Sequence, residues 1–145
     1  MDMSPQAYQA YLKSIVPKSP VGKNMALAFL VGGGICCLGQ ALGQWYGLLG
    51  LSQQEASGAA SVTLVFLSAL STGLGLYHRL ARYAGAGTLV PITGFANAVA
   101  SPAIDFRTEG IVTGTAVKMF SVAGPVIVFG TAASVAYGLL LWALG

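Results

Sequence analysis

Four polar side chains recur every four residues in the second half of the chain: Asn97, Ser101, Asp105 and Glu109. Residues at this spacing lie on one face of an α-helix, so the pattern predicts a polar stripe along a short helix. An amide, a hydroxyl and two carboxylates can hydrogen-bond a polar solute and hold it near water. Because a charged carboxylate at the centre of a membrane helix costs roughly 2.5–3.5 kcal/mol, we expect Asp105 to lie near water or to pair with Arg107.

The segment around the start of this stripe is apolar but poorly suited to a continuous helix. No charged residue occurs from Tyr83 to Ile104, yet residues 85–97 contain three glycines, a proline, two threonines and an asparagine. We expect residues 85–94 to be largely irregular and residues 95–106 to form the short helix. Lipid cannot satisfy the backbone groups of irregular chain, so such a segment is either buried in protein or lines a water-filled path.

We interpret this segment as part of a path for a polar solute. A helix that begins near Gly94 presents unpaired N–H groups at its N-terminus, and these favour an anion such as a carboxylate. The alternative is that the glycines let the segment pack tightly as a re-entrant plug, with Asn97 bonded to neighbouring backbone. The residues that we expect along the path are Thr88, Thr93, Gly94, Asn97, Ser101, Asp105 and Glu109.

The other reactive residue types form no catalytic or metal-binding pattern. His78 is the single histidine, the chain has four carboxylates, and Cys36 and Cys37 are adjacent within an apolar stretch. The Gly-Ala-Gly run at residues 85–87 lacks the third glycine and the preceding strand of a dinucleotide-binding loop. We therefore expect no enzymatic activity, no cofactor and no metal site.

The composition is that of an integral membrane protein. Of the 145 residues, 55% are hydrophobic and 8% are charged, whereas soluble domains carry roughly 25% charged residues. No charge lies between residues 24 and 54, between residues 56 and 77, or from Met119 to the end. Each gap meets the length of about 18 residues that a membrane helix needs.

We therefore predict an all-α integral membrane protein with three to four membrane segments. Residues 1–22 should form an amphipathic helix in the cytoplasm or at its membrane interface, followed by a linker, and residues 23–145 a helical membrane domain. The expected spans are residues 25–48, 59–77 and 111–143, the last kinked near residues 124–125. The segment at residues 84–104 either dips into the membrane and returns or crosses it.

Small residues at a spacing of four predict surfaces where helices pack closely. Three crossings or four can hardly enclose a wide aqueous path, so a pore would need several subunits, and these stripes offer surfaces for a homo- or hetero-oligomer. The stripes are Gly39, Gly43 and Gly47 in the first span and Gly130, Ser134 and Gly138 in the last.

Basic residues indicate the orientation rather than a nucleic-acid surface. Lys13, Lys18 and Lys23 precede the first span, and Arg79 and Arg82 follow the second. Because cytoplasmic loops are enriched in lysine and arginine, this pattern places the N-terminus in the cytoplasm. We expect the two arginines to anchor their helix end at lipid phosphates.

Two motifs resemble a known family. They are residues 28–40 (AFLVGGGICCLGQ) and residues 85–97 (GAGTLVPITGFAN). The chain resembles the stage V sporulation protein AC family, one of the SpoVA membrane proteins of endospore-forming bacteria, from about residue 23 to residue 130. The N-terminal segment favours this family over the smaller AE type. His78 departs from the family pattern, where we expect an acidic residue.

The resemblance implies a function that suits a broken membrane segment. Members of this family take part in moving dipicolinic acid with calcium across the spore inner membrane, into the forespore and out at germination, and are described as mechanosensitive channels. The implied partners are the AE-type membrane subunit and the soluble AD subunit. Two hypotheses follow: an oligomeric channel subunit, and a non-conducting assembly subunit of the same complex.

Overall fold

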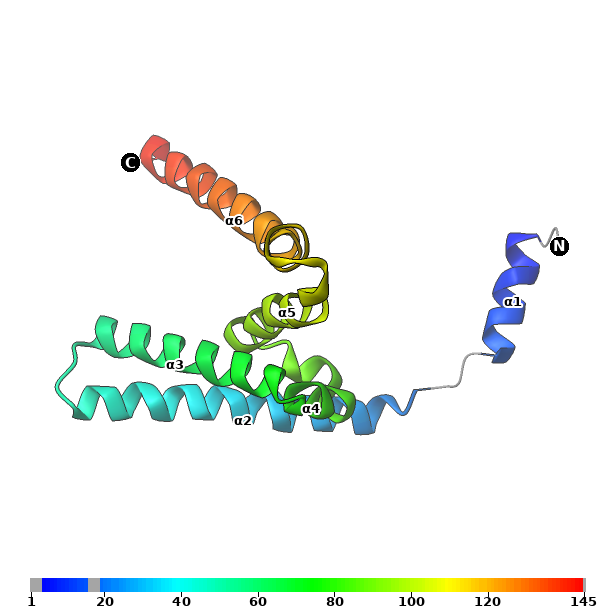
Figure 1. The fold of residues 1–145 in the computed structure, drawn as a ribbon, viewed down its shortest axis with the longest axis horizontal. Helices are drawn as coiled ribbons and strands as arrows, with labels where there is room; N and C mark the ends of the chain where they lie inside the picture. Colours follow the sequence, from blue (N-terminus) through cyan, green and yellow to red (C-terminus); the bar gives the residue numbers. More distant parts are fainter. Residues whose placement is uncertain (1–3, 16–18, 145) are drawn as a thin grey trace.

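The computed structural model describes residues 4–15 and 19–144, and every regular element in these residues is helical (Figure 1). The all-α expectation is confirmed. In chain order the elements are α1 (Pro5–Ile15), α2 (Val21–Leu48), α3 (Gln53–Gly73), α4 (Leu76–Ala84), the 3-10 helix η1 (Gly85–Thr88), α5 (Pro91–Asp105), the 3-10 helix η2 (Arg107–Glu109), the π-helix η3 (Ile111–Ala116) and α6 (Val117–Leu144).

Three helical stretches are long and apolar enough to cross a membrane: Val21–Leu48, Gln53–Gly73 and Ile111–Leu144. Their number lies within the expected three to four. With 15 residues, α5 is about 22 Å long at a rise of 1.5 Å per residue, which is short against a hydrocarbon core of about 30 Å.

The N-terminal helix is present as α1, within the expected residues 1–22. Its amphipathic character and its place at the membrane surface stay predictions. The side chain of Lys13, all of Lys18 and the linker residue Pro17 lie outside the described residues.

The first two spans form a hairpin, in which α3 begins at Gln53 rather than at residue 59. Ser52 Oγ accepts a hydrogen bond from the Glu55 N–H at 3.4 Å, while the Glu55 carboxylate accepts one from the Ser52 N–H at 2.9 Å. This reciprocal capping box satisfies N–H groups that a helix start otherwise leaves unpaired. Across the hairpin, the hydroxyl oxygens of Tyr46 and Thr63 lie 2.8 Å apart.

Two glycines turn α4 out of line with α3. Gly75, before α4, has a φ of 69°, and Gly85, after it, has a φ of 51°. Residues with a Cβ adopt such values only with strain. The second span therefore ends at Gly73 instead of reaching residue 77, and α4 lies across the end of the hairpin beside the first turn of α2 (Figure 1).

After α4 the chain packs backbone to backbone against α2. A Cβ built on Gly87 would come within 2.7 Å of Ala28 Cα, and one built on Gly32 would lie 3.2 Å from the Gly87 carbonyl oxygen. Glycine allows two backbones to approach this closely. The glycine-rich segment is thus held in a tight, buried contact.

The irregular segment is shorter than expected. The prediction of irregular chain as far as Gly94 was wrong, because α5 begins at Pro91. Proline suits the first helical position, where its missing N–H and fixed φ cost nothing. Val90 before it is extended, with φ −60° and ψ 131°, as a residue that precedes proline should be.

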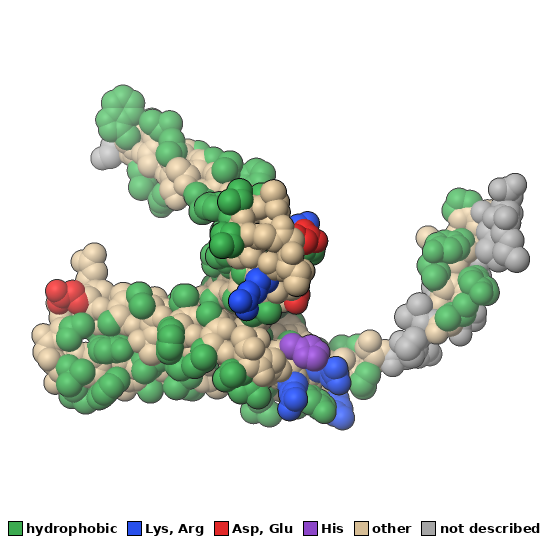
Figure 2. All heavy atoms as spheres, in the orientation of Figure 1, with side chains coloured by type: hydrophobic (Ala, Val, Ile, Leu, Met, Phe, Trp, Pro, Cys, Tyr) green, Lys and Arg blue, Asp and Glu red, His purple; other side chains and the backbone are tan. Residues whose placement is uncertain are grey.

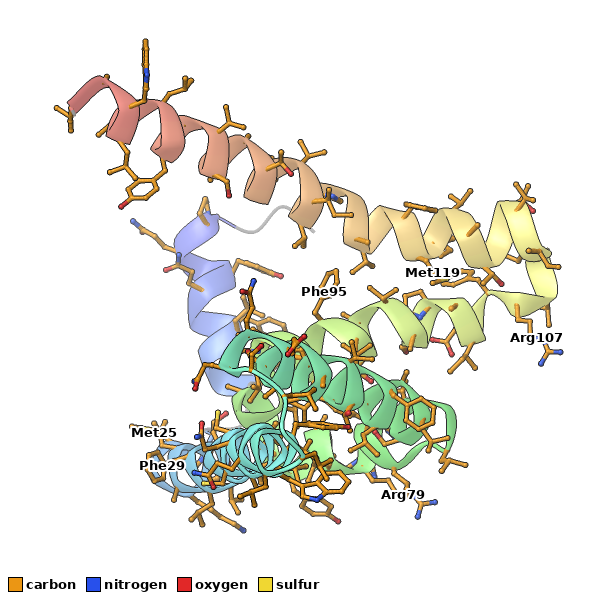
Figure 3. The ribbon with its side chains drawn as sticks, turned by 90° about the vertical axis from the view of Figure 1, so that its left-hand side faces the viewer. Met25, Phe29, Arg79, Phe95, Arg107 and Met119 are labelled. Carbon is orange, nitrogen blue, oxygen red and sulfur yellow. The ribbon has the colours of Figure 1, made fainter. Side chains whose placement is uncertain are left out.

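The last helix turns back over α5, as Figure 3 shows. Thr115 Oγ1 donates a hydrogen bond to the Ala103 carbonyl at 3.4 Å, and Lys118 Nζ lies 4.3 Å from the centre of the Phe106 ring. Beyond this contact α6 extends away from the other helices, continuous through Pro125 (Figure 1). The expected kink near residues 124–125 stays a prediction.

Hydrophobic side chains cover the outside of the long helices. Phe29 is 80% exposed, Phe129 74% and Trp142 83%, and Met25 and Phe29 point outward from α2 in Figure 3. Exposed apolar surface on this scale suits lipid rather than water. In Figure 2 charged side chains gather instead over α4 and the turn between α5 and α6.

Candidate functional site

An open groove of about 530 Å³ lies where α4 meets α5 and the C-terminal end of α3. It brings a guanidinium, an imidazole, an amide, two hydroxyls and a carboxylate into one place in a mostly apolar chain. The lining residues are Thr72, His78, Ala81, Arg82, Asn97, Ser101, Ile104 and Asp105.

Three residues of the predicted polar stripe border this groove from α5: Asn97, Ser101 and Asp105. Ser101 Oγ donates a hydrogen bond to Asp105 Oδ2 at 3.4 Å. Successive members are one helical turn apart, so the stripe extends about 12 Å along the groove. Glu109 does not continue it, because α5 ends at Asp105 and Glu109 belongs to η2.

Asn97 is held by a side chain of α3. Thr72 Oγ1 donates to Asn97 Oδ1 at 2.8 Å and also lies 2.8 Å from the Ser68 carbonyl oxygen. A hydroxyl carries one proton, so Thr72 can donate to only one of these two acceptors at a time. Rotation of this hydroxyl therefore frees Asn97 Oδ1 without leaving the Thr72 proton unbonded, and the half-buried amide can exchange this partner for a solute.

The wall opposite α5 is cationic. His78 and Arg82 lie one turn apart on α4, and Arg82 Nη2 is 3.4 Å from His78 Nε2. Because a guanidinium has donors only, Nε2 must be the acceptor in this contact. Within the described ranges the other N–H groups of Arg82 have no partner and can bind an anion, and its side chain is exposed.

The sequence interpretation missed this wall. It assigned Arg82 to anchoring at lipid phosphates and did not place His78 or Thr72 on the solute path. The i, i+4 spacing of His78 and Arg82 was visible in the sequence, but only the turn at Gly75 directs this face toward α5.

Thr88 lies outside the groove, in the packed interior. It is 4% exposed; its hydroxyl donates to the Gly85 carbonyl at 2.9 Å, and its own carbonyl accepts from Tyr77 Oη at 2.7 Å. The bond from Tyr77 joins η1 to α4, and the bond to Gly85 lies within η1. They satisfy backbone that lipid would leave unpaired.

Thr93 and Gly94 also lie in packed surroundings. Thr93 is 6% exposed, and its carbonyl accepts a hydrogen bond from Ser68 Oγ at 2.6 Å, whereas its own hydroxyl has no partner among the described residues. A Cβ on Gly94 would lie 3.0 Å from the Thr88 carbonyl oxygen. Three predicted path residues, Asn97, Ser101 and Asp105, therefore line the groove. Three others, Thr88, Thr93 and Gly94, lie in packed surroundings instead.

The predicted packing stripes meet few neighbours within the chain. A Cβ on Gly39 would lie 3.2 Å from Leu64 Cδ1, so Gly39 faces α3. Gly43 and Gly47 border a polar hollow of about 280 Å³ near the hairpin turn. Gly130 and Gly138 have open space around them, and the Ser134 hydroxyl bonds the Gly130 carbonyl at 2.8 Å.

A family comparison identifies the chain. A sequence model described as SpoVAC/SpoVAEB sporulation membrane protein matches residues 24–140. The chain belongs to this SpoVAC/SpoVAEB family. It is also 44% identical over 137 residues to stage V sporulation protein AC of Bacillus subtilis (strain 168), covering 94% of this chain and 91% of that protein. No solved structure matches it.

The SpoVAC/SpoVAEB match confirms the resemblance that the two motifs indicated. The matched residues include the whole groove, from Thr72 to Asp105, and both glycines of the tight contact, Gly32 and Gly87. The helix α1 precedes the match. The lining side chains of the groove offer hydrogen bonds and charge. Among the described residues no three His, Cys, Asp or Glu side chains gather as metal ligands.

Proposed function

We propose that this SpoVAC/SpoVAEB protein is a subunit of an oligomeric channel in the forespore inner membrane. The channel moves dipicolinic acid and its calcium chelate into the forespore and releases them at germination, opened by membrane tension. The observation that carries the proposal is the groove in which Asn97, Ser101 and Asp105 face Arg82 in an otherwise apolar chain.

The groove has the properties that passage requires. Dipicolinate is a small anion with two carboxylates, and the groove offers hydrogen-bond donors from a guanidinium, an amide and a hydroxyl. Because His78, Arg82 and Asp105 are exposed, solute bound there stays partly hydrated and is held weakly. A conduit must release what it binds, so weak binding favours conduction.

The free helix faces support an oligomer. Two long helices, α2 and α6, have no buried residue, and the small-residue stripe of α6 remains open to other subunits. We propose the AE-type membrane subunit as the partner there, with the soluble AD subunit closing the path from the cytoplasm. Lys23 and Arg82 lie at the same end of the hairpin, which supports a cytoplasmic N-terminus.

A second candidate function is a non-conducting assembly subunit. It is favoured by the burial of Thr88 and Thr93 and by the tight contact of Gly87 with α2. In this reading the glycine-rich segment is a structural plug, and the open faces of α2 and α6 hold a conducting partner.

The experiment that tests the proposal is dipicolinate release from liposomes that contain the purified protein, with and without an osmotic downshift. We expect release above that of empty liposomes, increased by the downshift. Asn97→Leu should reduce release severalfold without preventing membrane insertion, because it removes an amide from the groove. Ser121→Ala is the control, since Ser121 is exposed on α6 and its hydroxyl bonds the Lys118 carbonyl within the same helix.

Equal release from Asn97→Leu and Ser121→Ala would remove Asn97 from the path. Absence of release by the wild-type protein, restored when the AE-type subunit is added, would indicate an obligate hetero-oligomer. Absence of release in both cases would favour the assembly function.

A further inference from the structure

Building on the proposed function, in which several subunits form the channel, we propose that the polar hollow between α2 and α3 is a contact surface between two copies of this chain. Glutamine side chains from both copies meet in the hollow and hydrogen-bond one another. This surface lies apart from the open stripe of α6, so one subunit can bind a second copy and a different subunit at once.

The hollow has a volume of about 280 Å³ and lies near the hairpin turn, at the opposite end of the hairpin from α4 (Figure 1). Gln40, Gln44 and Gln53 line it with Ser57, and none of its lining residues is charged. All four side chains are exposed. Within the described ranges their amides and hydroxyl exchange no hydrogen bond with another residue. The described chain therefore leaves these four polar groups for a ligand or a partner outside it.

Part of this cluster lies at membrane depth. Gln44 and Gln40 are four and eight residues before Leu48, the last residue of α2, so they lie about 6 and 12 Å from that helix end. Glu55 is only two residues after Gln53, the first residue of α3, and its charge keeps this end of the hairpin near water. Gln40 therefore lies more than one helical turn inside the span, where lipid offers no hydrogen-bond partner.

A second copy supplies the groups that these amides lack. A glutamine amide carries two N–H donors and a carbonyl acceptor, so one glutamine is complementary to another. A twofold axis brings the same surface of two copies together, and the amides of each can then donate to and accept from those of the other. Because no lining residue is charged, this contact brings no like charges together. Interhelical hydrogen bonds of this kind stabilise the association of membrane helices.

The surface also has room for a partner. Gly43 and Gly47 border the hollow, and a Cβ built on either meets no atom within 4 Å. One turn before Gly43, a Cβ on Gly39 would lie 3.2 Å from Leu64 Cδ1, so that part of α2 is already covered by α3. The contact with the second copy is therefore confined to the C-terminal part of α2 and the start of α3.

Cysteine cross-linking of the full-length protein in lipid vesicles locates the contact. The native thiols are first removed as Cys36→Ser and Cys37→Ser, and single cysteines are then placed at positions 40, 43, 44 and 47. A disulfide needs Cβ atoms about 4 Å apart, so oxidation should join two copies in at least one of these variants. Trp45→Cys is the control and should give severalfold less dimer, because Trp45 is exposed but does not line the hollow.

Removal of the amides tests their contribution. Gln40→Leu combined with Gln44→Leu should raise the dissociation constant between two copies by about tenfold or more, because hydrogen bonds on both sides of the contact are lost. Energy transfer between labelled copies, measured as added lipid dilutes the protein, gives this constant. Gln54→Leu is the matched control, since Gln54 is an exposed glutamine outside the hollow. Its dissociation constant should stay within about twofold of wild type.

Three results would overturn the inference: no more dimer at any of the four positions than at position 45, equal dissociation constants for the double variant and Gln54→Leu, or cross-links that form only to an added AE-type subunit. Reaction of the Gln44→Cys thiol with a polar reagent, in protein that gives no dimer, would show that water fills the hollow instead.

The liposome assay judges the proposed channel separately. Cross-linking and weakened association as expected, but no dipicolinate release even with the AE-type subunit, would support the contact and overturn the channel. Release by protein that shows none of these cross-links would keep the channel and overturn the contact.

Discussion

At the scale of single residues, the groove is lined by side chains whose hydrogen bonds to the protein can be exchanged for bonds to a solute. Thr72 stands between two acceptors, the Asn97 amide and the Ser68 carbonyl, each 2.8 Å from its hydroxyl oxygen. Arg82 and Asp105 each have one weak contact at 3.4 Å. Arg82 and Asp105 can exchange their protein partners for a solute at little cost, because these contacts are long. Thr72 can release Asn97 because its hydroxyl then donates to the Ser68 carbonyl.

Thr72→Val is the prediction that belongs to this scale. The change keeps the shape of the side chain but removes the one hydrogen bond that Asn97 Oδ1 accepts from the residues the structure describes. We expect the free energy of unfolding to fall by about 1 kcal/mol, the usual net value of one hydrogen bond. Denaturation of the protein in mixed micelles measures it.

Ser61→Ala is the control for Thr72→Val. Ser61 is also on α3, but its hydroxyl bonds only the Ser57 carbonyl within the same helix. Surface changes of this kind alter stability by less than about 0.5 kcal/mol. If both variants unfold together, the bond between Thr72 and Asn97 does not stabilise the fold.

At the scale of elements, the position of α4 and α5 rests on the contact between η1 and α2. Gly87 meets Ala28 and Gly32 through backbone atoms, so the two segments approach without side chains between them. Tyr77 Oη and Ser68 Oγ then hold the segment from the other side, through the carbonyls of Thr88 and Thr93. The position of the groove therefore depends on contacts outside it, namely the packing of η1 against α2 and the two hydrogen bonds from Tyr77 and Ser68.

Gly87→Ala should disturb this contact. The added Cβ would lie 2.7 Å from Ala28 Cα, a backbone atom that cannot rotate away. Overpacking of this kind costs about 1–3 kcal/mol, and the displaced segment should also reduce dipicolinate release. Thermal unfolding of the purified protein and the liposome assay measure the two effects.

Gly43→Ala provides the comparison for Gly87→Ala. A Cβ on Gly43 meets nothing within 4 Å, and the residue lies inside α2. Alanine is favoured over glycine in a helix by up to about 1 kcal/mol, so stability should be unchanged or higher. Similar losses in both variants would contradict the account of the η1 contact.

At the scale of the whole molecule, three spans and a short helix leave much apolar surface without a protein partner. The last span is the clearest example, since none of the 28 residues of α6 is buried. Lipid can cover this surface, but a small-residue stripe offers a closer fit to another helix. The groove between α4 and α5 is open within one chain.

Ser134→Leu tests the assembly. Ser134 lies between Gly130 and Gly138 on a face with open space around it. A leucine there would fill the surface where another helix is expected to pack, so we expect a smaller oligomer by size-exclusion chromatography with light scattering. Val135→Leu, one residue along and also exposed, should leave the oligomer unchanged. An unaltered oligomer in both variants would exclude this stripe as the interface.

The sequence by itself determined the class of the protein, its helical spans, its family and the polar face of α5. The class, the spans and the polar face depend on local quantities, namely hydropathy over about 20 residues and a spacing of four. The family follows from the two motifs at residues 28–40 and 85–97. The start of α3 at Gln53 is also encoded locally, by the Ser52-x-x-Glu55 capping box, although the predicted span began only at residue 59. The start of α5 at Pro91 carried a local signal as well.

Only the tertiary structure decided which polar residues meet. Thr88, Thr93 and Asn97 are all uncharged polar residues within one segment, yet Thr88 and Thr93 are buried and Asn97 faces the groove. The turn at Gly75 brings Arg82 opposite Asp105, across 23 positions of chain (105 − 82). Such contacts follow from how helices pack over long sequence separations, and no local pattern encodes which faces come together.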